Sequence, residues 1–109
     1  MRKLLAVALV AFVLAAPAAA SVRLVRVTSP IRHGAYATLV ARVSRAATCS
    51  ITVYYKSGPS HARGLYPKHT TGGRVGWTWK VGTRTTPGRW PIRVSCGAAG
   101  TLNTSFVVT

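Results

Sequence analysis

Apolar and polar residues alternate through most of the chain beyond residue 20, and residues 74–96 show this pattern most clearly. The alternating apolar residues there are Val75, Trp77, Trp79 and Val81 in a first segment and Trp90, Ile92, Val94 and Cys96 in a second. A period of two is typical of a β-strand with one buried face. The stretch therefore predicts two strands. We expect one strand in each of two sheets, with residues 82–88 crossing between them and Pro87–Gly88 as the central pair of a type II turn.

Other alternating segments predict strands at residues 22–28, 35–43, 49–56 and 101–109. The alternation slips between Leu24 and Val25, which indicates a bulge or an edge position. Residues 61–73 show no clear period, and we expect a long loop with one short edge strand. After residue 20, no segment has apolar residues at helical spacing. Six to seven strands within residues 21–109 predict an all-β fold, an immunoglobulin- or fibronectin-III-like two-sheet β-sandwich.

Residues 1–20 have the pattern of a secretory signal peptide that precedes this domain. Arg2 and Lys3 form a positive start, residues 4–16 are an apolar run, and three alanines at 18–20 suit a cleavage site. An uncleaved membrane anchor is the alternative, but the apolar run is short for a bilayer span. We therefore expect a secreted or extracytoplasmic protein that is not an integral membrane protein. Residues 21–109 are expected to form its single immunoglobulin-like domain.

Cys49 and Cys96 are the only cysteines, and an even number in an oxidising compartment favours a disulfide. Free or metal-bound thiols are the alternative, although no CxxC or nearby CxxH spacing supports a metal site. Cys49 begins the third strand and Cys96 ends the sixth, each on the apolar face, so the expected bridge joins antiparallel neighbours within one sheet. The immunoglobulin bridge instead crosses between sheets. If the two cysteines lie opposite each other, the numbers of paired residues sum to 145.

Several motifs in the middle of the chain bear on the fold by resemblance. They are YYKSGPS at 54–60, Gly64–Leu65, Pro67–Lys68 and GWTWKVGTRTTPGRWPIRVSC at 76–96. These motifs resemble a recurring signature of small secreted bacterial proteins with a single immunoglobulin-like β domain. The resemblance implies that fold and export from the cell. It implies no catalytic site, because that group of proteins has no assigned activity.

The chain carries 15 lysines and arginines and no aspartate or glutamate, a formal charge of +15. Hydrolytic and acid–base chemistry mostly relies on carboxylates, so we expect a protein that is not an enzyme and holds no cofactor. His33, His61 and His69 fall in predicted loops without ligand spacing, and we expect them to be exposed. A zinc or copper site formed by these three imidazoles is the alternative.

The expected register gives a candidate polyanion-binding site on the outer face of the cysteine-linked sheet. It places Lys56 opposite Arg89 and Thr52 opposite Arg93, with Tyr54 as an exposed ring beside them. Arginine binds phosphate, sulfate or carboxylate through paired N–H donors, and a tyrosine ring can stack on a ligand. The alternative is a positive charge spread over the whole surface, which gives solubility and a general attraction to anions.

The alternating pattern predicts which aromatic residues are buried and which are exposed. Exposed tryptophans on a sheet can form a stacking platform for sugars or bases. The three tryptophans, Trp77, Trp79 and Trp90, instead alternate in step with the apolar residues of their strands. We therefore expect them to be buried in the core. The rings expected to be exposed are those of Tyr36, Tyr54 and Tyr66.

These features together predict a monomeric, non-catalytic interaction module. Its expected partners are anionic polymers, namely wall polymers, nucleic acid or anionic lipid headgroups, bound by electrostatics. The alternative is a protein-binding or inhibitor domain that acts through the loop at residues 61–73 or through a sheet edge.

Overall fold

The computed structural model describes residues 20–109. The predicted signal peptide lies outside the described residues, apart from its last position. The strands are β1 (Val22–Val27), β2 (Tyr36–Val43), β3 (Ala47–Tyr55), β4 (Gly58–Pro59), β5 (Lys68–Thr70), β6 (Gly73–Lys80), β7 (Gly88–Ser95) and β8 (Thr101–Val108). One turn of 3-10 helix, η1 (Gly97–Ala99), precedes β8. The all-β prediction is confirmed, and residues 61–73 include a short strand, β5, as expected.

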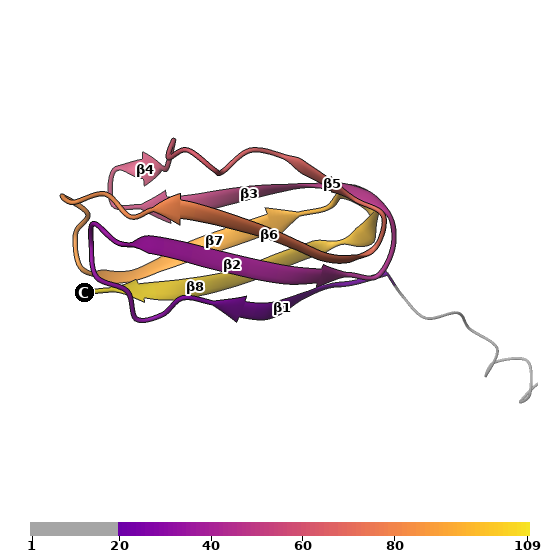
Figure 1. The fold of residues 1–109 in the computed structure, drawn as a ribbon, viewed down its shortest axis with the longest axis horizontal. Coiled ribbons are helices and arrows are strands. Elements are labelled where there is room, and N and C mark those ends of the chain that lie inside the picture. Colours follow the sequence, from indigo (N-terminus) through magenta and orange to yellow (C-terminus); the bar gives the residue numbers. More distant parts are fainter. Residues whose placement is uncertain (1–19) are drawn as a thin grey trace, which may run out of the picture.

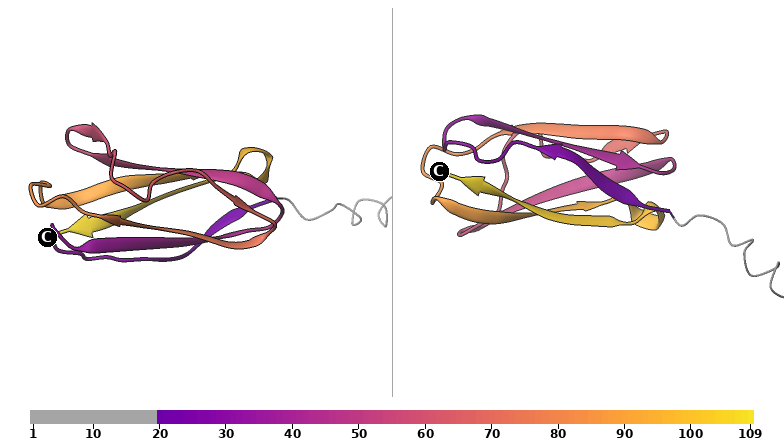
Figure 2. Two further views of the ribbon diagram at one scale, coloured as in Figure 1. Left: turned by 45° about the horizontal axis from the view of Figure 1, so that its top comes forward. Right: turned by 90° about the horizontal axis from the view of Figure 1, so that it is seen from below.

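The strands form two antiparallel sheets that pack against each other. The first has the order β1-β2-β6, and the second has the order β4-β3-β7-β8 with β5 also paired to β3. Figure 1 shows all eight strands, and the turned views of Figure 2 separate the two layers. β6 pairs with β2, whereas β7 pairs with β3 and β8. The chain therefore crosses between the sheets after β6, which confirms the predicted crossing.

The turn within this crossing differs from the prediction. The Thr85 N–H donates to the Gly82 carbonyl over 3.1 Å, so the chain reverses at residues 82–85. Gly88 already belongs to β7, where it is the register partner of Val108. Pairing with β8 extends β7 to Gly88, and for this reason Pro87–Gly88 is not the central pair of the turn.

The inward faces of both sheets meet in one apolar core. Trp77, Trp79 and Phe106 are its largest fully buried side chains. Trp79 packs edge-on against Phe106, with ring centroids 5.7 Å apart, and its indole N–H donates to the Tyr55 hydroxyl over 3.2 Å. Trp90 is less buried than predicted. Its ring faces the core side but is only half-buried, because it lies near the start of β7 and its indole N–H donates to a loop carbonyl, that of Thr86.

The predicted disulfide joins Cys49 of β3 to Cys96, which directly follows β7, with Cα atoms 4.1 Å apart. The strands are antiparallel neighbours in one sheet, as expected. Their register includes Ser50 opposite Ser95 and Thr52 opposite Arg93. The rule that paired residues sum to 145 is therefore confirmed for this ladder.

Two segments cover the open sides of the sandwich. On one side the chain beyond β1 runs beside β8. There the Ile31 N–H donates to the Val107 carbonyl, and the Ile31 carbonyl accepts the Thr109 N–H, over 2.8 Å each. On the other side residues 60–67, here called the strap, lie against the free edge of β6. The Trp77 indole N–H donates to the Tyr66 carbonyl over 2.9 Å. Gly64 approaches the Thr78 carbonyl so closely that no Cβ would fit there.

Candidate functional site

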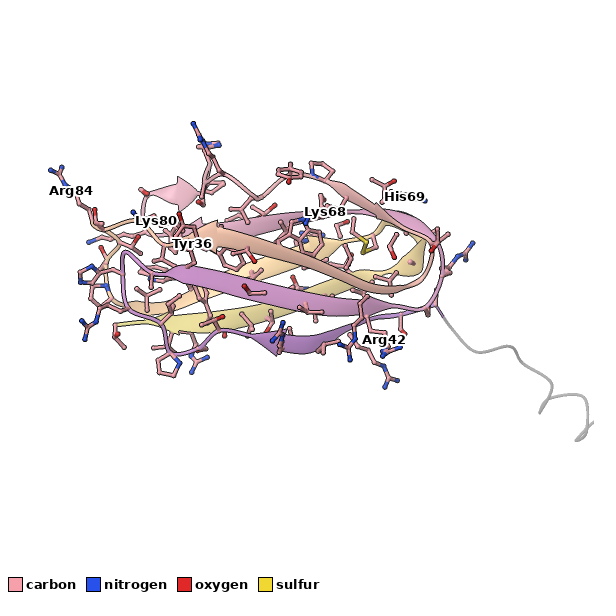
Figure 3. The ribbon with its side chains drawn as sticks, in the orientation of Figure 1. Tyr36, Arg42, Lys68, His69, Lys80 and Arg84 are labelled. Atoms are coloured by element: carbon pink, nitrogen blue, oxygen red, sulfur yellow. A yellow bond between two sulfur atoms is a disulfide. The ribbon has the colours of Figure 1, made fainter. Side chains whose placement is uncertain are left out.

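Three arginines lie side by side across the outer face of the three-stranded sheet. Arg42 of β2 is the register partner of both Arg23 in β1 and Arg74 in β6. All three side chains are exposed, and Figure 3 labels the central one, Arg42. Neighbouring strands are about 4.8 Å apart, so the three side chains span about 10 Å of the sheet. Arg23, Arg42 and Arg74 are called the arginine row below.

The alternation of each strand explains why these cations share a face. Ala41 and Val43 are buried in the core, so Arg42 between them must point outward. In β1 the register shifts between Leu24 and Arg26, which confirms the predicted bulge in an edge strand. Because the bulge adds one residue, Arg26 returns to the outer face and pairs with Val40.

Beside the arginine row is a flatter row in which Arg26, Val40 and Gly76 are register partners. Gly76 has no side chain, and Val40 is half-buried. At the edge of β6, the Lys68 ammonium group donates to the Gly76 carbonyl over 2.7 Å. An ammonium group has three N–H donors, so this bond leaves donors for other acceptors. A low surface is thus bordered by Arg26 at one end and Lys68 at the other.

The electrostatics of the arginine row are unfavourable in the isolated protein. Like charges directly opposite on a sheet are destabilising, and two unit charges 6 Å apart repel by about 0.7 kcal/mol in water. The chain has no aspartate or glutamate to neutralise them. Bound anions lower this repulsion and accept the guanidinium N–H groups. The face is therefore suited to bind anionic groups.

The site expected from the sequence is only partly assembled. Arg93 lies opposite Thr52 as predicted, but this ladder ends at Val53 and Ile92. Beyond that point the chain turns at residues 56–57 into β4. Lys56 therefore has no place opposite Arg89 in the sheet, and the Arg89 guanidinium donates to the Ser105 hydroxyl over 3.0 Å instead.

Tyr54 pairs with Pro59 of β4 and is exposed on the second sheet. The other two tyrosines predicted to be exposed, Tyr36 and Tyr66, are 67% and 59% exposed. Tyr36 is the register partner of Lys80 on the outer face of the first sheet, and both are labelled in Figure 3. The Lys68 ammonium lies 5.7 Å from the centroid of the Tyr66 ring.

The three histidines are exposed, as predicted. His69 lies within hydrogen-bond distance of the Thr48 hydroxyl, with 3.3 Å between Nδ1 and the oxygen. Within residues 20–109, no three histidine, cysteine or acidic side chains are placed to hold a metal ion together. The same residues include no helix of the length and apolar character needed to cross a membrane.

Comparison with known proteins adds no relative. No protein-family model matches the sequence, and no curated protein is significantly similar to it. The fold and the arrangement of charge are thus the observations that bear on function.

Proposed function

We propose that this protein is a non-catalytic interaction module that binds linear anionic polymers through the outer face of its three-stranded sheet. The observation that carries the proposal is the arginine row, in which one arginine from each strand of the sheet lies in a single line. The absence of aspartate and glutamate from the chain supports it, because no side-chain carboxylate competes with the ligand for these guanidinium groups.

The spacing of the cations favours an extended polymer with closely spaced charges. The row spans about 10 Å, and Arg26 lies two residues along the sheet from it, about 7 Å away. Successive phosphate, sulfate or carboxylate groups of one chain can therefore contact several cations together. Wall polymers and nucleic acids have this chemistry. Anionic lipid headgroups share the charge but form a surface rather than a line.

The proposed setting is outside the cell, and the proposed fold is an immunoglobulin- or fibronectin-III-like sandwich. The orders β1-β2-β6 and β4-β3-β7-β8 support this fold, since they divide seven strands between two sheets in the manner of such domains. The Cys49–Cys96 disulfide supports export, because such bonds persist in oxidising compartments.

The alternative of a protein-binding or inhibitor domain that uses residues 61–73 or a sheet edge stays a prediction. Within this loop, the Tyr66 carbonyl and the Lys68 ammonium both bond to β6. These bonds hold the loop against one edge of the first sheet, and this contact gives the loop a structural role.

The proposal is tested by retention of the oxidised protein on immobilised heparin, DNA and cell-wall material over a series of salt concentrations. We expect retention at low salt and elution as the salt rises, because counterions compete for the cations. Failure to bind any of the three materials at low salt contradicts the proposal. Retention on anionic lipid vesicles alone assigns the face to a membrane surface instead.

A further inference from the structure

A cleft of about 580 Å³ lies at the end of the sandwich far from the arginine row. Its lining residues are Tyr55, Lys56, Ser57, Gly82, Arg84, Thr85 and Thr86. They come from the end of β3, from the turn that follows it and from the crossing after β6. Figure 3 shows the two ends of the molecule, with Arg42 toward one and Arg84 at the other. The cleft is therefore a separate feature from the proposed polymer-binding face.

Tyr55 lines the cleft, and its side chain is held in place by the core. Its ring packs edge-on against Trp90, with centroids 6.3 Å apart, and at a tilt against Phe106, with centroids 6.1 Å apart. Its hydroxyl accepts the indole N–H of Trp79, a fully buried residue. The crossing is fixed as well, since the Thr86 carbonyl accepts the Trp90 indole N–H over 2.8 Å. Both walls are thus held by bonds to the core or to residues packed on it.

The remaining lining groups are donors and cations. Lys56 comes from one wall and Arg84 from the other, and Ser57, Thr85 and Thr86 bring hydroxyl groups. Lys56 and Arg84 are both exposed. Figure 3 shows Arg84 projecting outward from the loop at this end of the molecule. Because the chain has no acidic side chain, these groups are matched to an anionic ligand.

We propose that this cleft binds one anionic sugar unit, a single sugar ring that carries a phosphate or carboxylate group. The volume of about 580 Å³ lies within the roughly 300–1,000 Å³ range typical of small-molecule sites. Lys56 and Arg84 contact the anionic group, the hydroxyls of Ser57 and Thr85 bond to the sugar hydroxyls, and the Tyr55 ring packs against the sugar ring. This inference does not depend on the proposed polymer binding.

The test is an NMR titration of the oxidised protein with glucose 6-phosphate, glucuronate and glucose at about 0.15 M salt, where charges beyond about 8 Å are screened. We expect saturable shifts at the amides of Ser57, Thr85 and Thr86 with at least one charged sugar. Neutral glucose should bind about tenfold or more weakly, since it lacks the charge-assisted bonds. The charged sugar that binds identifies the anionic group, phosphate or carboxylate.

Two double variants separate the cleft from the general positive field. Lys56→Ala/Arg84→Ala should weaken binding about tenfold or more, whereas Arg23→Ala/Arg42→Ala, with the same charge change, should alter it by less than about twofold. All four side chains are exposed, so both variants should keep the wild-type spectrum of core amides. The inference is overturned if neither charged sugar gives saturable shifts in the cleft, if glucose binds as well, or if both variants lose binding equally. Loss of polymer binding in Arg23→Ala/Arg42→Ala with intact sugar binding separates this site from the sheet face.

Discussion

Arg42 and Arg74 lie directly opposite each other on β2 and β6, and Arg23 extends the same line across β1. A sheet optimised for stability alone would place opposite charges at such positions. The arrangement therefore links two properties of the protein. The same three guanidinium groups repel one another in the free domain and, in the proposed function, bind the anionic ligand.

Arg42→Glu should raise stability and reduce polymer binding together. The substitution converts two repulsive pairs, with Arg23 and with Arg74, into attractive ones, and each pair contributes a fraction of a kcal/mol. We expect the free energy of unfolding to rise by about 1 kcal/mol at low salt, with a smaller gain at high salt. Urea unfolding at two salt concentrations measures this. Arg63→Glu, in the strap, makes the same charge change without a strand partner, and an equal gain there contradicts the pairing argument.

Lys68→Met should destabilise the fold by removing a bond to the free edge of β6. The Lys68 ammonium donates to the Gly76 carbonyl and is half-buried, so the loss should be about 1 kcal/mol, below the full range for charged hydrogen bonds. Lys80→Met is the matched control, since Lys80 is an exposed lysine at the end of β6. Urea unfolding should place Lys80→Met within about 0.5 kcal/mol of wild type. Equal effects of the two substitutions contradict a role for the edge bond.

Tyr55 should make stability depend on pH in the alkaline range. Burial raises the pKa of its hydroxyl above the usual 10.0, and the hydrogen bond from Trp79 lowers it to a smaller extent. The unfolded chain therefore loses this proton at a lower pH than the folded protein. The stabilising contribution is complete below pH 10 and is lost as the pH rises through the pKa of the folded state.

Tyr55→Phe removes this contribution and leaves the buried Trp79 indole N–H without its partner. The variant should be less stable than wild type at neutral pH by about 1–2 kcal/mol, and the difference should shrink above pH 10. Urea unfolding between pH 7 and pH 11 measures the difference. Tyr36→Phe alters a tyrosine that is 67% exposed. The free energy of unfolding of this control should follow that of wild type across the pH range. A constant gap between wild type and Tyr55→Phe across that range refutes the role of burial.

Removal of the disulfide should cost a large share of the stability. The bridge between Cys49 and Cys96 closes a loop with a sequence separation of 47, and the chain-entropy account gives about 4 kcal/mol for a loop of this size. Cys49→Ala/Cys96→Ala should lose about that amount in urea unfolding. A loss below about 1 kcal/mol contradicts the entropic account of this bridge.

The sequence predicted the second sheet more fully than the first. The disulfide between Cys49 and Cys96 joins the ends of two strands, and this determined the register as far as Val53 opposite Ile92. The same extrapolation was wrong for Lys56 and Arg89. Proline lacks an N–H for the ladder, so Pro91 cannot complete the pairing toward Tyr54, and β3 turns away into β4.

The arginine row was not predicted because nothing in the sequence marks how β2 pairs with β6. The alternation within each strand puts Arg42 and Arg74 on an outer face but does not determine which residues lie opposite each other. Their alignment depends on a register between strands that no disulfide or short turn connects. Arg26 joins this face only through the bulge in β1. The burial of Trp90 was overestimated for a related reason. The alternating pattern shows which face of the sheet a residue is on, but not how far the residue lies from the end of the sheet.

The most direct test of the polymer-binding proposal compares two triple variants with equal loss of charge. Arg23→Ala/Arg42→Ala/Arg74→Ala removes the arginine row, and Lys56→Ala/Arg89→Ala/Arg93→Ala removes the cations of the site expected from the sequence. Binding of each to a short DNA duplex is measured over a salt series, because the slope of log K against log salt is about −0.9 per phosphate contact. The proposal predicts that loss of the arginine row makes the slope shallower by about 2–3, and that the other variant changes it by less than about 1. Equal changes in the two variants would show that binding follows net charge alone and contradict the proposed face.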